Sequence, residues 1–213
     1  MENWAHAFEA IGDNCEFGFM QQKKGVDEGA LLKWCRIMAY QDLLTFLEAP
    51  QAAFYQRENL SPTFDDMLCD ASSGILYHTV LYSREENGER QFNAQGDEFD
   101  RIYAAELEKK TYMYNKFFDG LRGAEKFYVF KMNGTNDVAM ATEIGACLAT
   151  FNPQNRLLYV TDENAQRIGT VEKLNDNTYR GYIQALAPYF PVTDAKLEYW
   201  EPMCDEALRV MRA

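Results

Sequence analysis

The sequence is poor in positive charge and in long apolar runs, and both shortages exclude classes of partner. Lys and Arg number 21 against 33 Asp and Glu, which gives a net charge of −12, and no basic run exceeds two residues. Nucleic acid and anionic membrane surfaces are therefore not expected as partners, because clustered basic side chains bind both. No stretch approaches the roughly 20 apolar residues of a membrane span, and the first ten residues lack a secretory-signal pattern.

Paired cysteines and metal-binding motifs are also lacking. The five cysteines are odd in number, widely spaced and form no Cys-x-x-Cys pair: Cys15, Cys35, Cys69, Cys147 and Cys204. Such spacing predicts neither a disulfide framework nor a zinc site, and free thiols indicate a reducing cytoplasm. Only two histidines are present, and the 134–137 turn lacks both glycine-rich phosphate-binding patterns. We therefore expect neither a metal nor a cofactor.

Helical and strand patterns alternate along the chain, which predicts one domain over residues 1–213. The clearest signal is strand, helix and strand within 126–161, a βαβ unit with a parallel strand pair. Other strands are predicted at 7–12, 67–70, 74–82 and within 170–187, other helices at 41–48, 51–57, 97–121 and 202–212, and an exposed loop at 83–97. The fold class is α/β, with mixed α+β as the alternative, and a central sheet carries packed helices.

Cys15 lies where a helix is expected to begin. Asp13 is predicted as the N-cap with Glu16 as its capping-box partner, and a helix of about 11 residues follows, ending near Gly25. A helix N-terminus favours the reactive thiolate, and the N–H groups near Asn14 and Glu16 would stabilise a developing oxyanion. The carboxylates of Asp13 and Glu16 oppose this effect, because a nearby negative charge raises the pKa of a thiol.

A nucleophilic cysteine also needs a base, and the chain offers only His6 and His78. His78 lies in the predicted strand GILYHTVLY, where it faces one side and Thr79 the other. The order of cysteine before histidine fits the papain-like arrangement, whereas His6 is expected to be an exposed terminal residue. The competing interpretation is a buried thiol and an ordinary core histidine.

A third group should orient the imidazole of His78. Asn93, Gln91 and Asp97 follow it in the polar segment, and Asn93 is preferred because papain-like sites often use asparagine. Asn133 is a further option, since the carboxyl ends of parallel strands collect functional residues. Its alternative role is a helix cap.

Residues 8–34 combine an Ile-Gly pair, an Asn-Cys-Glu triplet, a glutamine-rich helix end and a glycine, in FEAIGDNCEFGFMQQKKGVDEGALLKW. This stretch resembles the opening of a bacterial family of unknown function whose members are described as papain-like cysteine peptidases. The later order, a Tyr-His strand followed by a long helix and a βαβ-like segment, is similar in outline. The resemblance implies Cys15 as the nucleophile and His78 as the base. Many members carry Asp directly after the histidine, where this sequence has Thr79, so the third group is not implied.

Two functional hypotheses follow. The first is a cysteine hydrolase that cleaves an amide or related acyl bond in a peptide- or glycan-containing substrate through Cys15 and His78. The second is a non-catalytic binding or assembly protein of surface-polysaccharide biosynthesis, since domains of the resembling family occur beside glycosyltransferase and methyltransferase domains. In that case the aromatic residues, 14% of the chain, would mark the binding surface, with Trp34, Trp200, Tyr112 and Tyr114 as candidates.

Overall fold

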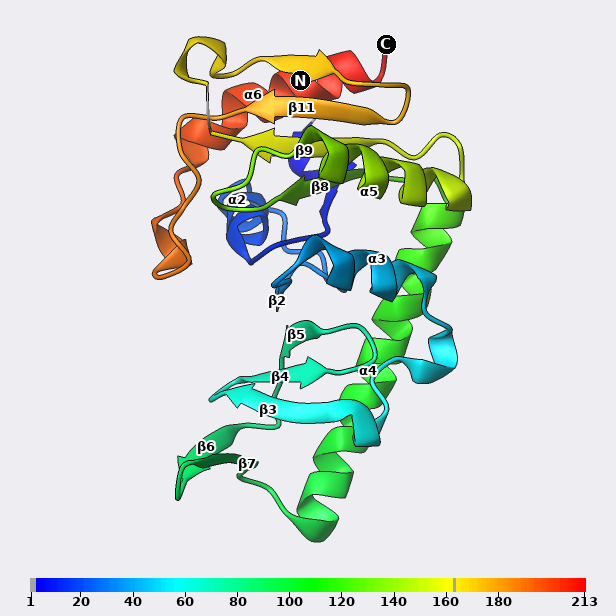
Figure 1. Ribbon diagram of the computed structural model, residues 1–213, viewed down its shortest axis with the longest axis vertical. Coiled ribbons are helices and arrows are strands. Elements are labelled where there is room, and N and C mark those ends of the chain that lie inside the picture. Colours follow the sequence, from blue (N-terminus) through cyan, green and yellow to red (C-terminus); the bar gives the residue numbers. More distant parts are fainter. Residues whose placement is uncertain (1–2, 163) are drawn as a thin grey trace.

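A five-stranded sheet forms the upper part of the molecule (Figure 1). The computed structural model describes residues 3–162 and 164–213. The strands run in the order β1 (Phe8–Ala10), β8 (Phe127–Lys131), β9 (Leu157–Thr161), β11 (Thr178–Tyr182) and β10 (Val171–Lys173). The first four are parallel and β10 is antiparallel to β11. The chain thus has the predicted α/β character, and β8, α5 (Val138–Phe151) and β9 form the predicted βαβ unit.

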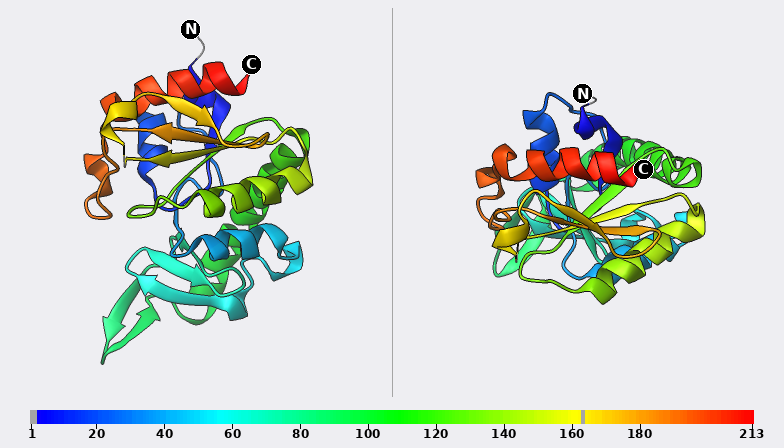
Figure 2. Two further views of the ribbon diagram at one scale, coloured as in Figure 1. Left: turned by 45° about the horizontal axis from the view of Figure 1, so that its top comes forward. Right: turned by 90° about the horizontal axis from the view of Figure 1, so that it is seen from above.

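Helices cover both faces of this sheet (Figure 2). One face packs against α1 (Trp4–Ala7), α2 (Glu16–Lys23) and α6 (Leu197–Met211), around the buried rings of Trp4, Phe17 and Trp200. The other face packs against α5 and, beyond it, α3 (Tyr40–Glu48). The strands β8 and β9 are buried almost throughout because they have helices on both sides.

A second, antiparallel sheet forms the lower part of the molecule (Figure 1). Its order is β2 (Cys35–Arg36), β5 (Ile75–His78), β4 (Met67–Asp70) and β3 (Leu60–Phe64). The pair β4 and β5 is the predicted hairpin, and Met67 lies opposite His78 in its register. The predicted helix at 51–57 is replaced by two short 3-10 turns, Gln51–Ala53 and Arg57–Asn59.

The exposed loop predicted for 83–97 is wrong. The chain instead forms a hairpin from β6 (Ser83–Glu86) and β7 (Glu89–Phe92). Asn87 and Gly88 both have positive φ, at 55° and 81°, as the type I′ turn of a two-residue hairpin requires. Both strands are mostly exposed and polar, so the alternation of apolar residues that marks a strand is missing.

The long helix α4 (Gly96–Gly123) runs beside both sheets (Figure 1). Its buried side chains, including Tyr114, Phe117 and Phe118, belong to one core cluster. That cluster extends from Tyr159 on the upper sheet to Tyr77 on the lower sheet. The two sheets therefore share a hydrophobic core, with α4 as the element that both contact. No helix of the described residues is both long enough and apolar enough to cross a membrane.

Candidate active site

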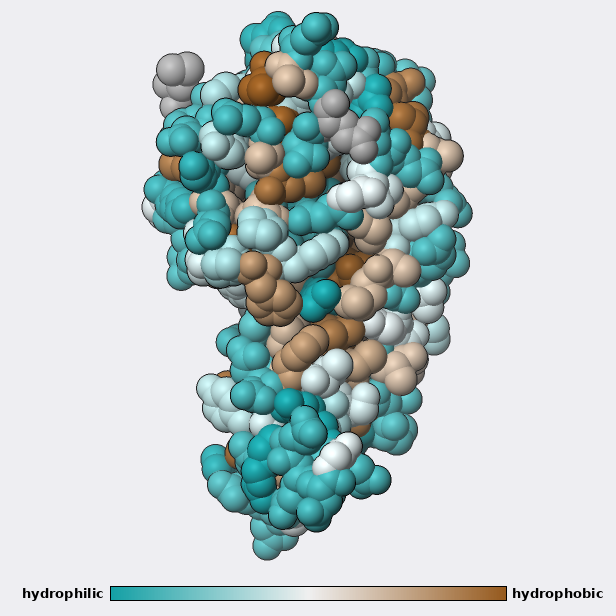
Figure 3. Space-filling view, turned by 60° about the vertical axis from the view of Figure 1, so that its left-hand side comes forward, coloured by the Kyte–Doolittle hydropathy of each residue, from teal (hydrophilic) through white to brown (hydrophobic). Residues whose placement is uncertain are grey.

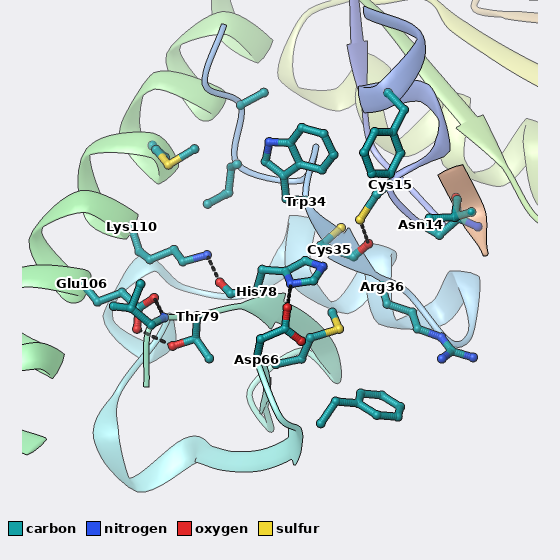
Figure 4. A pocket seen from close by; sticks show the side chains of 18 of the residues that line it. Asn14, Cys15, Trp34, Cys35, Arg36, Asp66, His78, Thr79, Glu106 and Lys110 are labelled. Carbon is teal, nitrogen blue, oxygen red and sulfur yellow. Dashed lines mark hydrogen bonds and ion pairs between the residues drawn. The ribbon is translucent and has the colours of Figure 1, made fainter. Parts of the chain in front are cut away.

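A pocket of about 700 Å³ opens between the two sheets, and both Cys15 and His78 line it (Figure 4). Cys15 comes from the start of α2 on the upper side, and His78 from the end of β5 on the lower side. The helix α4 contributes Lys110 and Met113, and the segment before α6 contributes Tyr189. The two residues that the sequence singled out are thus brought to one cavity from distant parts of the chain.

The Cys15 thiol sits at the entrance to α2 and is 8% exposed. Cys15 itself is the N-cap, because the helix begins at Glu16 rather than directly after Asp13. The side chain of Asn14 accepts the Glu16 N–H at 2.9 Å. The thiol donates weakly to the backbone carbonyl of Cys35 on β2, at 3.8 Å. The helix N-terminus was placed correctly to within a turn, but its predicted capping residue was wrong.

Asp13 and Glu16 do not form a capping box but a buried ion cluster. Their carboxylates lie 2.9 and 3.0 Å from the ammonium of Lys131 at the end of β8, and all three side chains are at most 1% exposed. Glu16 also accepts the indole N–H of Trp200 at 2.9 Å, and Asp13 accepts the hydroxyl of Tyr189 at 2.8 Å. These residues fix the Cys15 loop against the upper sheet and α6.

Asn133 belongs to the same cluster and not to the imidazole. Its side chain accepts from Lys131 at 2.7 Å and donates to the Ala187 carbonyl at 2.6 Å. The cap of α5 is Asp137, whose carboxylate accepts from the N–H groups of Ala139 and Met140. Asn133 therefore neither orients His78 nor caps a helix, which were its two predicted roles.

The His78 imidazole is held by Asp66, with Nδ1 and the carboxylate oxygen 2.9 Å apart. His78 and Asp66 are 42% and 53% exposed. From Asp66 the ring points toward the side of the pocket that carries Cys15 (Figure 4). A partner on Nδ1 fixes the ring and leaves Nε2 for proton transfer. The pocket lining therefore includes an acid, an imidazole and a thiol. The acid and the imidazole are in direct contact, whereas the thiol donates to the Cys35 carbonyl.

Asn93 does not take this orienting position. It lies beyond β7 and accepts from the Arg84 guanidinium at 3.0 Å, outside the set of residues that line the pocket. Asp66 was not predicted, because the candidates for this role all follow His78 in the sequence. The register of the predicted β4–β5 hairpin could have indicated Asp66. It pairs Met67 with His78, which places Asp66 beside the imidazole.

The helix α4 braces the backbone around His78. Glu106, which is buried, accepts the Thr79 hydroxyl at 2.6 Å and the Val80 N–H at 3.1 Å. One turn later, Lys110 donates to the His78 carbonyl at 3.2 Å. Thr79 thus faces away from His78, as the strand pattern predicted, and supports the strand rather than the imidazole. Burial lowers the pKa of Lys110 to about 8.

The resting thiol is protonated near neutral pH. Burial is the main cause that raises the pKa of Cys15 to about 11; the carboxylates of Asp66 and Asp13 contribute to this rise, and the Lys131 ammonium opposes it. The sequence anticipated the effect of Asp13, whereas the larger causes, burial and Asp66, come from the tertiary structure. A nucleophilic Cys15 must therefore lose its proton as it attacks, rather than exist beforehand as a stable thiolate.

Asn14 places an amide beside the thiol. It is 6% exposed and lines the pocket, and its Nδ2 group has no hydrogen-bond partner among the described residues. A buried donor without a partner costs free energy, and an acceptor on a bound ligand would relieve that cost. Such an acceptor is what an oxyanion site binds.

The four aromatic candidates lie in three different environments. Trp34 lines the pocket, whereas Trp200 and Tyr114 are buried in the core and Tyr112 lies exposed on α4. Within the described residues no group of three or more His, Cys, Asp and Glu side chains is placed to hold a metal ion.

Comparisons with protein-family models, with curated proteins and with solved structures found no match.

Proposed function

We propose that the protein is a cysteine hydrolase that cleaves an amide or related acyl bond. The observation that carries the proposal is the convergence of Cys15, His78 and Asp66 on one pocket, with Asp66 on the imidazole Nδ1. The sequence resemblance to papain-like peptidases supports the same roles for Cys15 and His78. All five cysteines are free thiols, which supports a reducing cytoplasm as the proposed location.

The reaction would proceed through an acyl-enzyme. The Cys15 sulfur attacks the carbonyl carbon while His78 Nε2 takes the thiol proton, and the oxyanion accepts a hydrogen bond from Asn14 Nδ2. His78 then returns the proton to the leaving amine or alcohol as the bond to carbon breaks. Water adds to the thioester with His78 as base, which releases the acid and restores the thiol. Asp66 stabilises the imidazolium through its contact with Nδ1.

The test is the alkylation rate of Cys15 by iodoacetamide across pH, followed by peptide mass. A thiol with a pKa of about 11 that lacks a base reacts slowly at pH 7, because only its thiolate is nucleophilic. We expect Cys15 to react faster than glutathione at pH 7, and His78→Ala to slow it by about 100-fold, within the range of general-base contributions. The half-buried Cys69 and Cys147 serve as internal references in the same chain.

The matched control is His6→Ala. His6 also pairs with a carboxylate through Nδ1, Glu28 at 3.0 Å, but lies outside the pocket, so its loss should leave Cys15 unchanged. If Cys15 reacts no faster than glutathione and both histidine variants match the wild type, the hydrolase proposal fails. The second hypothesis, a non-catalytic binding protein that uses the Trp34 pocket, would then replace it.

A further inference from the structure

The guanidinium of Arg36 lies at the pocket without an acidic partner. It sits 5.2 Å from the ring centre of Tyr189, 5.8 Å from that of Phe190 and 5.9 Å from that of Phe64. Across residues 3–162 and 164–213, no carboxylate is within ion-pair distance of it. Aromatic faces orient a guanidinium but leave its N–H fork free for a carboxylate or phosphate.

The charge of the pocket is opposite to that of the whole protein. Its lining contains three cations, Arg36, Lys109 and Lys110, and two carboxylates, Asp66 and Glu106. Both carboxylates are already engaged, Asp66 by His78 and Glu106 by the Thr79 hydroxyl and a backbone N–H. Lys110 is engaged as well, because it donates to the His78 carbonyl, which leaves Arg36 and Lys109. In a chain of net charge −12, this local excess of positive charge favours anions at one cavity.

Most of the remaining lining is apolar or aromatic. Phe19, Trp34 and Met113 line the pocket, and the rim carries Tyr82 and Phe190, which are 54% and 77% exposed. Apolar side chains gather in the waist between the two parts of the molecule (Figure 3). Large exposed aromatic residues around a cavity indicate a ligand that covers apolar surface.

We propose that the substrate is an amphipathic anion, whose apolar body lies on the aromatic lining and whose carboxylate or phosphate binds Arg36. This inference rests on the proposed hydrolase function and adds the class of acyl substrate. Arg36 follows Cys35, whose carbonyl accepts the Cys15 thiol, so an anion on Arg36 would place the rest of the molecule along the wall that carries the nucleophile. Arg36 extends from β2 on the side of the pocket away from Lys110 (Figure 4).

The experiment measures binding to the Cys15→Ala variant by calorimetry, so that the result does not depend on any reaction. The probes are N-benzoyl-phenylalanine, its neutral primary amide and 4-biphenyl phosphate. We expect at least one of the two anions to bind about tenfold or more tightly than the amide, as for a charge-assisted bidentate contact. The anion that binds more tightly identifies the substrate group as a carboxylate or a phosphate.

Arg36→Gln in the same background should abolish the preference for the anion and leave the affinity for the amide unchanged. The matched control is Arg84→Gln, an exposed arginine on the β6–β7 hairpin that lies outside the pocket, and it should keep the preference. Equal binding of the anions and the amide to the Cys15→Ala protein, or an unchanged preference after Arg36→Gln, would overturn the inference.

Two further measurements keep the test decisive. If Arg36→Gln lowers the melting temperature too far for calorimetry, Arg36→Lys replaces it: a point charge loses the bidentate geometry, so the preference should shrink but not vanish. A preference that Arg36→Lys leaves at its full size would also overturn the inference. If the anions do not bind but iodoacetamide alkylates Cys15 as expected, only the proposed substrate class is refuted. If the anions bind but Cys15 is not alkylated, only the hydrolase proposal is refuted.

Discussion

Replacing Asp66 by Asn separates two effects of this carboxylate that have opposite signs. Asp66 raises the pKa of the Cys15 thiol, so its removal should lower that pKa and increase the thiolate fraction. Asp66 also holds Nδ1 of His78 at 2.9 Å, so its removal should free the imidazole and allow the wrong tautomer. A purely electrostatic role predicts faster alkylation of Cys15, and an orienting role predicts slower alkylation.

We expect the orienting effect to dominate, with Asp66→Asn slowing Cys15 alkylation at pH 7 by about 10- to 100-fold, part of the usual contribution of a general base. Stability should hardly change. The His78–Asp66 pair is 42% and 53% exposed, and pairs this exposed contribute about 0–1 kcal/mol. In a protein of this size such a change moves the melting temperature by no more than about 4 °C.

The assay is iodoacetamide labelling from pH 6 to 10 with a melting curve for each variant. Glu28→Gln is the matched control, since Glu28 makes the equivalent contact with His6 at 3.0 Å, outside the pocket. The orienting role would be refuted if the Asp66→Asn protein had an unchanged melting temperature and its Cys15 were labelled as fast as in the wild type, or faster.

Two further predictions concern ionisable side chains on the upper sheet. Lys131→Met leaves Asp13 and Glu16 buried without their cation and should lower the free energy of unfolding in urea by about 3–5 kcal/mol. Lys173→Met removes the cation of an exposed pair and should lower the free energy of unfolding far less. Equal losses in the two variants would contradict the prediction. Burial raises the pKa of Glu9 to about 7, so the folded state retains a proton that the unfolded state releases above pH 4.5. Stability should therefore fall as pH rises from 4.5 through about 7, and Glu9→Gln should flatten the melting temperature over this range; an equally steep dependence in the variant would exclude Glu9 as the cause.

The elements with a strong pattern were predicted well. The βαβ unit at 126–161 and the hairpin predicted at 67–82 have clear apolar runs, and both form, although the second strand of the hairpin ends at His78 rather than at residue 82. The opposite orientations of His78 and Thr79 also follow from strand geometry alone. The β6–β7 hairpin failed because its strands are exposed and polar, so only the Asn87-Gly88 turn indicated it.

Only some residues of the candidate site could be predicted from the sequence. Cys15 and His78 stood out because reactive residue types are few, and the structure places both at one pocket. Asp66 has no distinguishing neighbours in the sequence, and only the β4–β5 register brings it to His78. Asp13 and Glu16 fit a capping box locally, but Lys131, far away in the chain, determines where their carboxylates lie.

The loop that carries Cys15 depends on contacts between residues that lie far apart in the sequence. Strand β1 pairs with β8, where Phe8 lies opposite Phe127, and Glu16 accepts the indole N–H of Trp200 in α6. Contacts so distant in sequence form late in folding, since chain closure must precede them. A chain that lacks α6 would therefore carry the Cys15 thiol without the Trp200 contact that holds Glu16.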